Sequence, residues 1–263
     1  MAASSTVPRL AADGSPYPER GLPTFERDVR RMFAHLSRRY ERFNHAAALG
    51  NDLLWRHCAL WELDRFRRGP VRRALDIGCG TGEFARAVSG HFPGADVLGL
   101  DFTRAMVVEA HDRRAPRGRA GHLAYGTGNA LSIPCADRSF DLVTNAFVAR
   151  NLRDLPAAFH EMRRVLRPGG VALTLEISEP PSPTFRRVFH THFDKVVPML
   201  GRAVGNEGPS RYLPESLRGF PSRSEVLGML RASGFPRTGA RSYSFGIVTA
   251  FLAETDPVPP QSR

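Results

Sequence analysis

The residues Leu75-Asp76-Ile77-Gly78-Cys79-Gly80-Thr81-Gly82 place three alternating glycines directly after a short apolar segment. A glycine-rich turn between a strand and a helix lets a ligand approach the backbone closely. A dinucleotide-binding turn has the spacing GxGxxG, whereas this turn has the spacing GxGxG, which makes it a weaker match to a nicotinamide site. We therefore expect a ligand pocket at this turn.

Around the turn, short apolar stretches alternate with stretches of helical periodicity. The expected strands cover 73–77, 96–100, 123–125, 140–146 and 171–177, and the expected helices between them cover 83–91, 103–113 and 155–166. Helices at 25–43 and 52–66 come before, and a helix at 224–233 and strands at 241–244 and 247–253 come after. This alternation predicts an α/β fold, with a mostly parallel sheet that helices cover on both faces.

The segment 179–220 interrupts the alternation, because it is rich in proline and aromatic residues and is too long for an ordinary connection. We expect it to form a helical lid within a single domain over 23–254. Residues 1–22 lack the apolar stretch of a secretory signal and are expected to be a disordered leader. Residues 255–263 contain three prolines and are expected to be a flexible tail.

The composition sets limits on the class of protein. The chain has 263 residues, of which 42% are hydrophobic and 24% charged, so it is long and apolar enough to bury a full core. It has no apolar run of the length that a membrane span needs. The cysteines Cys58, Cys79 and Cys135 never form a CxxC pair, and this predicts neither a disulfide framework nor a thiolate metal site. We expect a cytoplasmic protein.

The formal net charge is +11, and Lys195 is the single lysine among 37 basic residues. A coding bias towards arginine is the simplest explanation, and an anionic partner is the alternative. The arginines are scattered, and no basic run is interleaved with aromatic residues, so we do not expect nucleic acid as a partner. Contact with an acidic membrane surface remains open.

Several polar residues follow the expected strands, where ligands of open parallel sheets bind. Asp101 ends the second strand, and its carboxylate can accept hydrogen bonds from both ribose hydroxyls of an adenine nucleoside. The alternative is a carboxylate at the start of the helix near Thr103, but the glycine turn favours the ribose interpretation. Arg150 and Asn151 follow the fourth strand and should face a second substrate, although position alone fits a surface charge and a turn residue equally well.

The glycine turn, with Asp76, resembles the S-adenosylmethionine (SAM) motif of class I methyltransferases. Four further segments, in order, resemble the UbiE family of ubiquinone/menaquinone biosynthesis C-methyltransferases. They are Tyr40-Glu41-Arg42-Phe43-Asn44 with Leu49-Gly50 and Trp55-Arg56, then 147–151, then 164–170 with Glu176 and Ser178, and finally Arg211-Tyr212-Leu213-Pro214-Glu215-Ser216. The resemblance covers about residues 25–253. The chain departs from the family at Glu41, Ala48, Asp52, Ala146 and Val148, where the family has Asp, Ser, His, Ser and Gly, mostly around the acceptor pocket.

The resemblance implies a Rossmann-like class I methyltransferase sheet whose last strand is antiparallel. It also implies SAM as cofactor, S-adenosylhomocysteine (SAH) as product, and a hydrophobic aromatic or quinol acceptor, with demethylmenaquinol as the main candidate. A specialised aromatic metabolite is the alternative acceptor, and peripheral membrane contact and a homodimer remain open. The implied cofactor-binding residues are Asp76, Gly78, Gly80, Thr81, Asp101, Phe102, Asn129, Ala130 and Ala146.

On the acceptor side, we expect catalytic roles for Arg150, Asn151 and Tyr40. An arginine cannot easily serve as a base, but its charge can stabilise the phenolate of the acceptor, with Asn151 as the orienting partner. Tyr40 and Asn44 lie one helical turn apart and could close the site, although Tyr40 could equally be packing. Phe189, Phe193 and Tyr212 are the further substrate-binding candidates. His190 and His192 are two residues apart on a helix, which is a poor arrangement for a metal, so none is expected.

Two further function classes are compatible with the sequence. A nucleic-acid methyltransferase would bind RNA or DNA in a salt-sensitive way. A SAM-binding protein without transferase activity would return SAM intact after incubation with every acceptor.

Overall fold

The computed structural model describes His45, Ala48, residues 50–113 and 121–199, Pro214, Ser216, Leu217 and residues 219–257. The main helices are α2 (Asn51–Phe66), α3 (Glu83–His91), α4 (Arg104–Asp112), α5 (Leu155–Val165), α6 (Pro183–Thr191) and α9 (Arg223–Ala232). The strands are β1 (Arg73–Ile77), β2 (Asp96–Asp101), β3 (Leu123–Thr127), β4 (Phe140–Ala146), β5 (Leu166–Ile177), β6 (Arg237–Tyr243) and β7 (Val248–Glu254). The expected leader at 1–22 and the helix at 25–43 lie outside the described residues.

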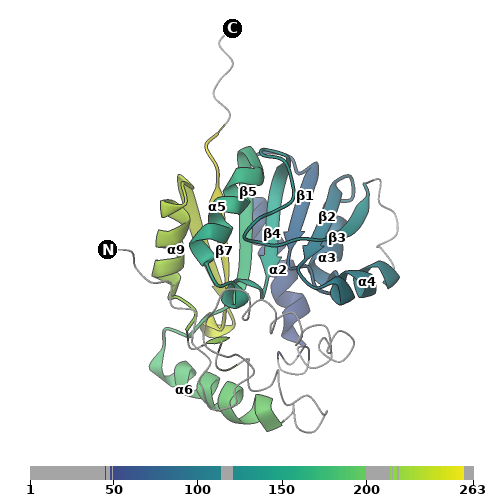
Figure 1. The fold of residues 1–263 in the computed structure, drawn as a ribbon. Helices are drawn as coiled ribbons and strands as arrows, with labels where there is room; N and C mark the ends of the chain where they lie inside the picture. Colours follow the sequence, from purple (N-terminus) through teal and green to yellow (C-terminus); the bar gives the residue numbers. More distant parts are fainter. Residues whose placement is uncertain are drawn as a thin grey trace.

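The strands form one seven-stranded sheet in the order β3-β2-β1-β4-β5-β7-β6 (Figure 1). All neighbouring pairs from β3 to β5 are parallel, and β7 runs antiparallel to both β5 and β6. The expected α/β fold, with its antiparallel last strand, is therefore confirmed. Because β1, β2 and β4 are parallel neighbours, their carboxyl ends meet at one edge of the sheet.

Two hydrophobic cores lie on opposite faces of the sheet. Neighbouring residues of one strand point to opposite faces, so that Ala74 packs into one core and Leu75 into the other. The first core contains the buried faces of α2 and α3, and the second contains those of α5 and α9. Helices thus cover both faces of the sheet. The edge where the carboxyl ends of the parallel strands meet remains available to a ligand.

Strand β5 begins earlier than the sequence predicts. The helix was expected to reach Leu166 and the strand to begin at 171, but the strand spans Leu166–Ile177, with a register shift opposite Phe140 and Leu142. The Pro-Gly-Gly segment remains beside the sheet because Gly169 N–H donates to Asp256 O and Thr255 N–H donates to Gly170 O.

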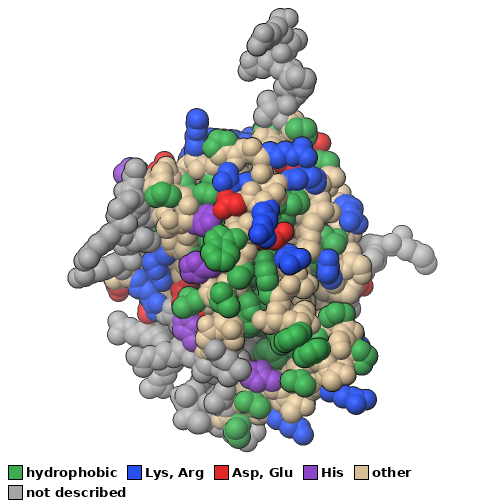
Figure 2. Space-filling view, turned by 180° about the vertical axis from the view of Figure 1, so that it is seen from behind, with side chains coloured by type: hydrophobic (Ala, Val, Ile, Leu, Met, Phe, Trp, Pro, Cys, Tyr) green, Lys and Arg blue, Asp and Glu red, His purple; other side chains and the backbone are tan. Residues whose placement is uncertain are grey.

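The expected lid is helical where the structure describes it. Helix α6 continues into a π-helical turn at His192–Val196, and Phe189, Phe193 and Val197 form a small buried cluster. Phe185 on α6 stacks against Phe245, with ring centroids 4.3 Å apart. Figure 1 shows α6 below the sheet, and Figure 2, seen from behind, shows hydrophobic side chains gathered over the same lower region with basic ones at their edge.

Candidate functional site

A cavity of about 190 Å³ lies at the carboxyl ends of β1, β2 and β4. The turn after β1, the residues after β2, the segment after β3 and the turn after β4 all contribute to its wall. The lining residues fall within 76–84, 101–106, 128–131 and 146–153, with Arg56 added from α2. The fold therefore brings together four segments in which the sequence motifs predicted ligand-binding residues.

The glycine turn has a backbone that other residues rarely adopt. Gly78, Gly80 and Gly82 have φ angles of 66°, 54° and 83°. A Cβ on Gly78 would lie 2.5 Å from Cγ2 of Val148, and a Cβ on Gly82 would lie 2.5 Å from the Tyr125 hydroxyl oxygen. A Cβ on Gly80 would meet nothing within 4 Å. The outer glycines are therefore required by packing, whereas the middle one borders open space.

Asp101 ties the glycine turn to the end of β2. Its Oδ2 accepts a hydrogen bond from Gly80 N–H at 2.8 Å, and its Oδ1 accepts one from Thr103 N–H at 2.7 Å. Burial raises the pKa of the Asp101 carboxyl, and these two N–H groups oppose the rise. A carboxylate oxygen has two lone pairs, so ribose hydroxyls can still donate to both oxygens. The two interpretations of Asp101 from the sequence are thus compatible.

Asp76 is buried beneath the same turn. Its Oδ1 accepts a hydrogen bond from the Thr144 hydroxyl at 2.8 Å, but no group of the described residues reaches Oδ2 at hydrogen-bond distance. Burial raises the pKa of Asp76 to about 7. A buried carboxylate with one unpartnered oxygen suits a ligand that carries a cationic donor, such as the α-ammonium group of SAM.

Three more of the residues that the resemblance implies for cofactor binding follow the ends of β2 and β3. Asn129, Ala130 and Phe102 line the cavity. The Asn129 Oδ1 accepts a hydrogen bond from Leu131 N–H at 2.9 Å, which fixes the local turn. The amide nitrogen of Asn129 and the backbone are therefore the groups suited to read a base.

The structure separates Arg150 from Asn151. Asn151 lines the cavity, whereas the Arg150 side chain is 3% exposed and its Nη1 lies 2.5 Å from Oε1 of the buried Glu176. The Arg150 backbone N–H also donates to Glu176 Oε2 at 3.1 Å. The two residues belong to a 3-10 turn, Ala149–Asn151, in which consecutive side chains point in different directions. Arg150 is thus not among the residues that line the cavity.

The remaining predicted residues divide into three groups. Gly78, Gly80, Thr81 and Ala146 line the cavity. Phe189 and Phe193 pack against each other in the lid, with ring centroids 4.6 Å apart, and are not among the lining residues. Tyr40, Asn44 and Tyr212 lie outside the described residues.

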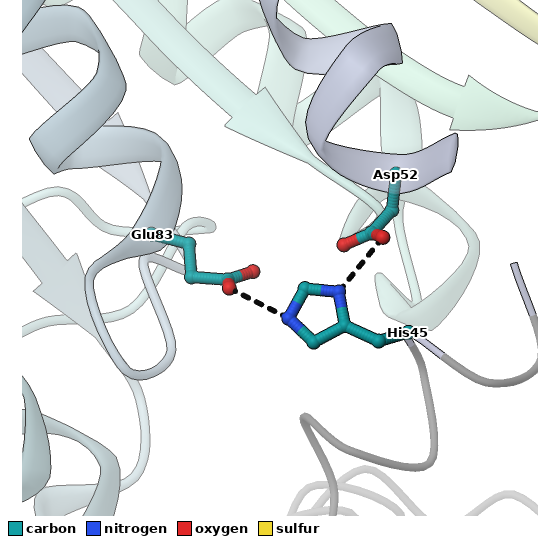
Figure 3. Close-up of side chains that lie close together, drawn as sticks. All are labelled: His45, Asp52 and Glu83. Carbon is teal, nitrogen blue, oxygen red and sulfur yellow. Dashed lines mark hydrogen bonds and ion pairs between the residues drawn. The ribbon is translucent and has the colours of Figure 1, made fainter. Parts of the chain in front are cut away.

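A ring of four charged or polar side chains joins α2 to α3 beside the cavity. His45 Nδ1 lies 2.8 Å from Asp52 Oδ1, and His45 Nε2 lies 3.1 Å from Glu83 Oε1 (Figure 3). Arg56 contacts the other oxygen of each carboxylate, at 2.8 Å and 3.1 Å. His45, Asp52 and Glu83 lie close enough together to share a metal ion, but the Arg56 guanidinium already contacts both carboxylates, and its charge disfavours a metal ion beside it.

Arg56 and Glu83 line the cavity but are not among the site residues predicted from the sequence. The available signals were positional. Glu83 follows the last glycine of the turn directly, and Arg56 belongs to the Trp55-Arg56 pair of the first family-like segment.

Comparisons with known proteins agree with this geometry. A family model described as the ubiE/COQ5 methyltransferase family matches residues 23–254. A demethylmenaquinone methyltransferase of Deinococcus radiodurans is 38% identical over 86% of this chain and 92% of its own length. A ubiquinone/menaquinone biosynthesis C-methyltransferase UbiE of Geobacter sulfurreducens is 35% identical over 86% of this chain and 88% of its own.

Solved structures show the same fold. A SAM-dependent methyltransferase from Thermotoga maritima matches with a TM-score of 0.59 and 18% identity, covering 86% of this chain and 99% of that one. A phosphoethanolamine N-methyltransferase from Haemonchus contortus, solved in complex with SAM, matches with a TM-score of 0.53 and 17% identity, covering 75% of this chain and 52% of that one.

Proposed function

The chain belongs to the ubiE/COQ5 methyltransferase family, and from that premise we propose that it transfers the methyl group of SAM to a ring carbon of demethylmenaquinol, a prenylated quinol, to give menaquinol. The observation that carries the proposal is the cavity, where a glycine turn, two buried carboxylates and open space over Gly80 suit an adenosyl amino acid. Several relatives are named demethylmenaquinone methyltransferase, which supports a prenylated quinol as the acceptor.

The chain's contribution to the reaction is position and exclusion of water. When bound, SAM supplies a methyl carbon that its sulfonium makes electrophilic. The acceptor carbon must be held in line with it at about 3 to 3.5 Å. Phe84, Met106, Phe147 and Val148 give the cavity an apolar wall, which keeps water away from the reacting carbon.

On the acceptor side, we assign Asn151 to contact the quinol. We assign Arg150 to hold in position the turn that carries Asn151. Arg150 remains charged and cannot accept the proton that the methylated ring carbon loses, so this proton passes to solvent. Its guanidinium and its backbone N–H both bind Glu176 at the end of β5, which fixes the turn at residues 149–151. Tyr40, Asn44 and Tyr212 remain proposals for closing the acceptor site, as do Phe189 and Phe193 for an apolar wall in the lid.

A reconstituted assay tests the function. The purified protein is incubated with SAM and a short-chain demethylmenaquinol, and the products are analysed by mass spectrometry. We expect the quinol to gain one methyl group on carbon, together with stoichiometric SAH. Absence of product with this acceptor, with methylation of smaller phenols instead, would favour the alternative acceptor class of specialised aromatic metabolites.

We also propose that the lid face rests on an anionic bilayer surface when the acceptor is membrane-bound. Phe185, Val188, Met199 and Phe245 are exposed there, and the exposed Arg187 and Lys195 lie along the same helical segment. Apolar side chains with basic neighbours are typical of a surface that binds anionic lipid. Over the described residues, no helix combines the length and apolar character needed to cross a bilayer.

Vesicle sedimentation tests this contact. The protein should sediment with vesicles rich in phosphatidylglycerol, and the double variant Phe185→Ser/Phe245→Ser should remain largely in the supernatant. Trp61→Ser, which removes a 60% exposed aromatic from α2, is the matched control and should sediment like the unchanged protein. Equal sedimentation of all three proteins would refute the lid as the contact.

A further inference from the structure

A second cavity, of about 400 Å³, lies at the opposite edge of the sheet from the cavity at the glycine turn. Its wall comes from the link between α2 and β1, from the start of β4, from the first half of β5 and from the end of β7. Because β7 is antiparallel to β5, its end meets the amino ends of the parallel strands at this edge. The proposed methyl transfer makes no use of this cavity.

The charged side chains of the wall are mostly arginines, and we call this space the arginine cavity. Four arginines and two carboxylates line it: Arg67, Arg68, Arg72, Arg167, Asp141 and Glu254. Figure 2 shows basic side chains gathered over the upper part of the molecule, at the end of the sheet opposite to α6 in Figure 1. The wall carries more positive than negative side chains, and this excess favours an anionic ligand.

The carboxylate of Asp141 is already occupied by groups of the protein. Its Oδ2 accepts hydrogen bonds from the backbone N–H groups of Arg72 and Arg73, each at 2.9 Å. Its Oδ1 accepts one from Arg167 Nη1 at 2.8 Å. Asp141 therefore neutralises part of the charge of Arg167 and fixes the backbone, but not the side chain, of Arg72.

The carboxylate of Glu254 is paired from outside the cavity. Arg237, which is not a lining residue, donates from Nε to Glu254 Oε2 at 2.7 Å. Arg68 Nε lies 4.0 Å from the same oxygen, at the limit of an ion pair, and its side chain is 68% exposed. Within the described residues, no hydrogen bond or ion pair engages the side chain of Arg72. Arg68 and Arg72 thus keep donors for a ligand.

The positions of the donors and the available space favour a diphosphate. Arg68 and Arg72 come from the link before β1, whereas Arg167 comes from β5, so their guanidinium groups reach the cavity from different segments. A tetrahedral phosphate accepts charged hydrogen bonds from several directions, whereas a carboxylate offers two oxygens in one plane. Among the described residues, nothing lies within 4 Å of a Cβ built on Gly69 or Gly169, so both glycines border open space.

We propose that the arginine cavity binds a small diphosphate from solution, with Arg68 and Arg72 as its contacts on one side and Arg167 on the other. The lid that we propose for the bilayer contact follows the carboxyl end of β5. The arginine cavity lies at the other edge of the sheet and would face away from that bilayer. The inference does not rest on the methyl acceptor, so the failure of either proposal leaves the other standing.

Calorimetric titration of the full chain with pyrophosphate tests the site. Saturating SAH occupies the cavity at the glycine turn, and the ionic strength is held constant because charge attraction depends on salt. We expect one pyrophosphate site with a dissociation constant below about 1 mM, and at least about tenfold weaker binding of the dicarboxylate succinate. No binding of pyrophosphate, or equal binding of succinate, would overturn the proposal, as would loss of pyrophosphate binding when SAH is added.

Two double variants locate the site. Arg68→Met/Arg72→Met should weaken pyrophosphate binding about 10- to 100-fold, because charged hydrogen bonds are lost, and should leave SAH binding within about twofold. Arg65→Met/Arg241→Met removes the same charge from exposed positions outside the wall, and it is the matched control. It should leave pyrophosphate binding within about threefold. Equal weakening by both variants would show a general attraction to a basic protein and would refute the site.

Vesicle sedimentation distinguishes a diphosphate in solution from the headgroup of a lipid. The Arg68→Met/Arg72→Met variant should sediment with phosphatidylglycerol vesicles as the unchanged protein does. If this variant stays in the supernatant, the cavity binds a lipid headgroup and the assignment to a ligand from solution is wrong. The comparison of pyrophosphate with succinate uses the unchanged protein, so it decides the ligand class even where a variant does not fold.

Discussion

Arg150 and Glu176 form a buried ion pair. We expect replacement of one partner to reduce the stability of the fold more than replacement of the other. Glu176 accepts three hydrogen bonds: from Arg150 Nη1 at 2.5 Å, from Arg150 N–H at 3.1 Å and from Ile177 N–H at 2.9 Å. In Glu176→Gln, the arginine keeps a charge that it cannot lose, and breaking a buried pair costs about 3–5 kcal/mol. For a domain of this size the melting temperature should fall by about 6–20 °C.

The reverse change should cost less. In Arg150→Met, Glu176 keeps two backbone N–H donors, from residues 150 and 177, so we expect a loss of about 1–2 kcal/mol. Thermal unfolding by circular dichroism, without ligand, compares the two variants with the unchanged protein. Arg150→Met should also reduce turnover far more than SAH affinity, because Asn151 is displaced. If Arg150→Met is as destabilising as Glu176→Gln, the assignment of the pair is wrong.

Three further predictions concern the cavity. Asp101→Asn should weaken SAH binding about 10- to 100-fold by calorimetry, since charged hydrogen bonds to the ribose are lost, and an unchanged affinity would contradict the ribose assignment. Asn151→Ala should lower kcat at least about tenfold while the SAH affinity stays the same, whereas a fully active variant would remove Asn151 from the acceptor site. Burial raises the pKa of Asp76 to about 7, so its carboxyl is largely neutral below that pH and SAH affinity should fall as the pH drops from 8 to 5. Asp76→Asn should abolish this dependence, and the same pH profile in the variant would show that another group is responsible.

The strands and helices near the glycine turn were predictable because apolar periodicity and glycine or proline punctuation coincide there. The expected segments 73–77, 83–91 and 140–146 have the bounds of β1, α3 and β4. Strand β6 was expected at 241–244 but occupies Arg237–Tyr243. Its first residues include Thr238-Gly239, which resemble a turn, and pairing with the whole length of β7 determines the strand.

The directions of side chains could not be predicted in the same way. Arg150 was correctly placed after β4, but a partner 26 residues away draws its side chain from the cavity. Arg56, Glu83 and His45 come from three separate segments, so their ring exists only once α2 packs beside α3. Sequence motifs thus indicate where a segment lies in the fold, whereas contacts between distant segments determine which of its side chains reach the cavity.

The contact between Gly78 and Val148 has a consequence for how this chain can change over time. A methyl group on residue 78 would lie 2.5 and 2.7 Å from the two Cγ atoms of Val148. The branched side chain of Val148 thus occupies the space that a side chain on residue 78 would need. Replacements at these two positions are therefore not independent, and their effects on stability should not add. A shorter residue 148 would relieve the steric clash of a side chain at residue 78, but it would not relieve the backbone strain that such a side chain has at a φ of 66°.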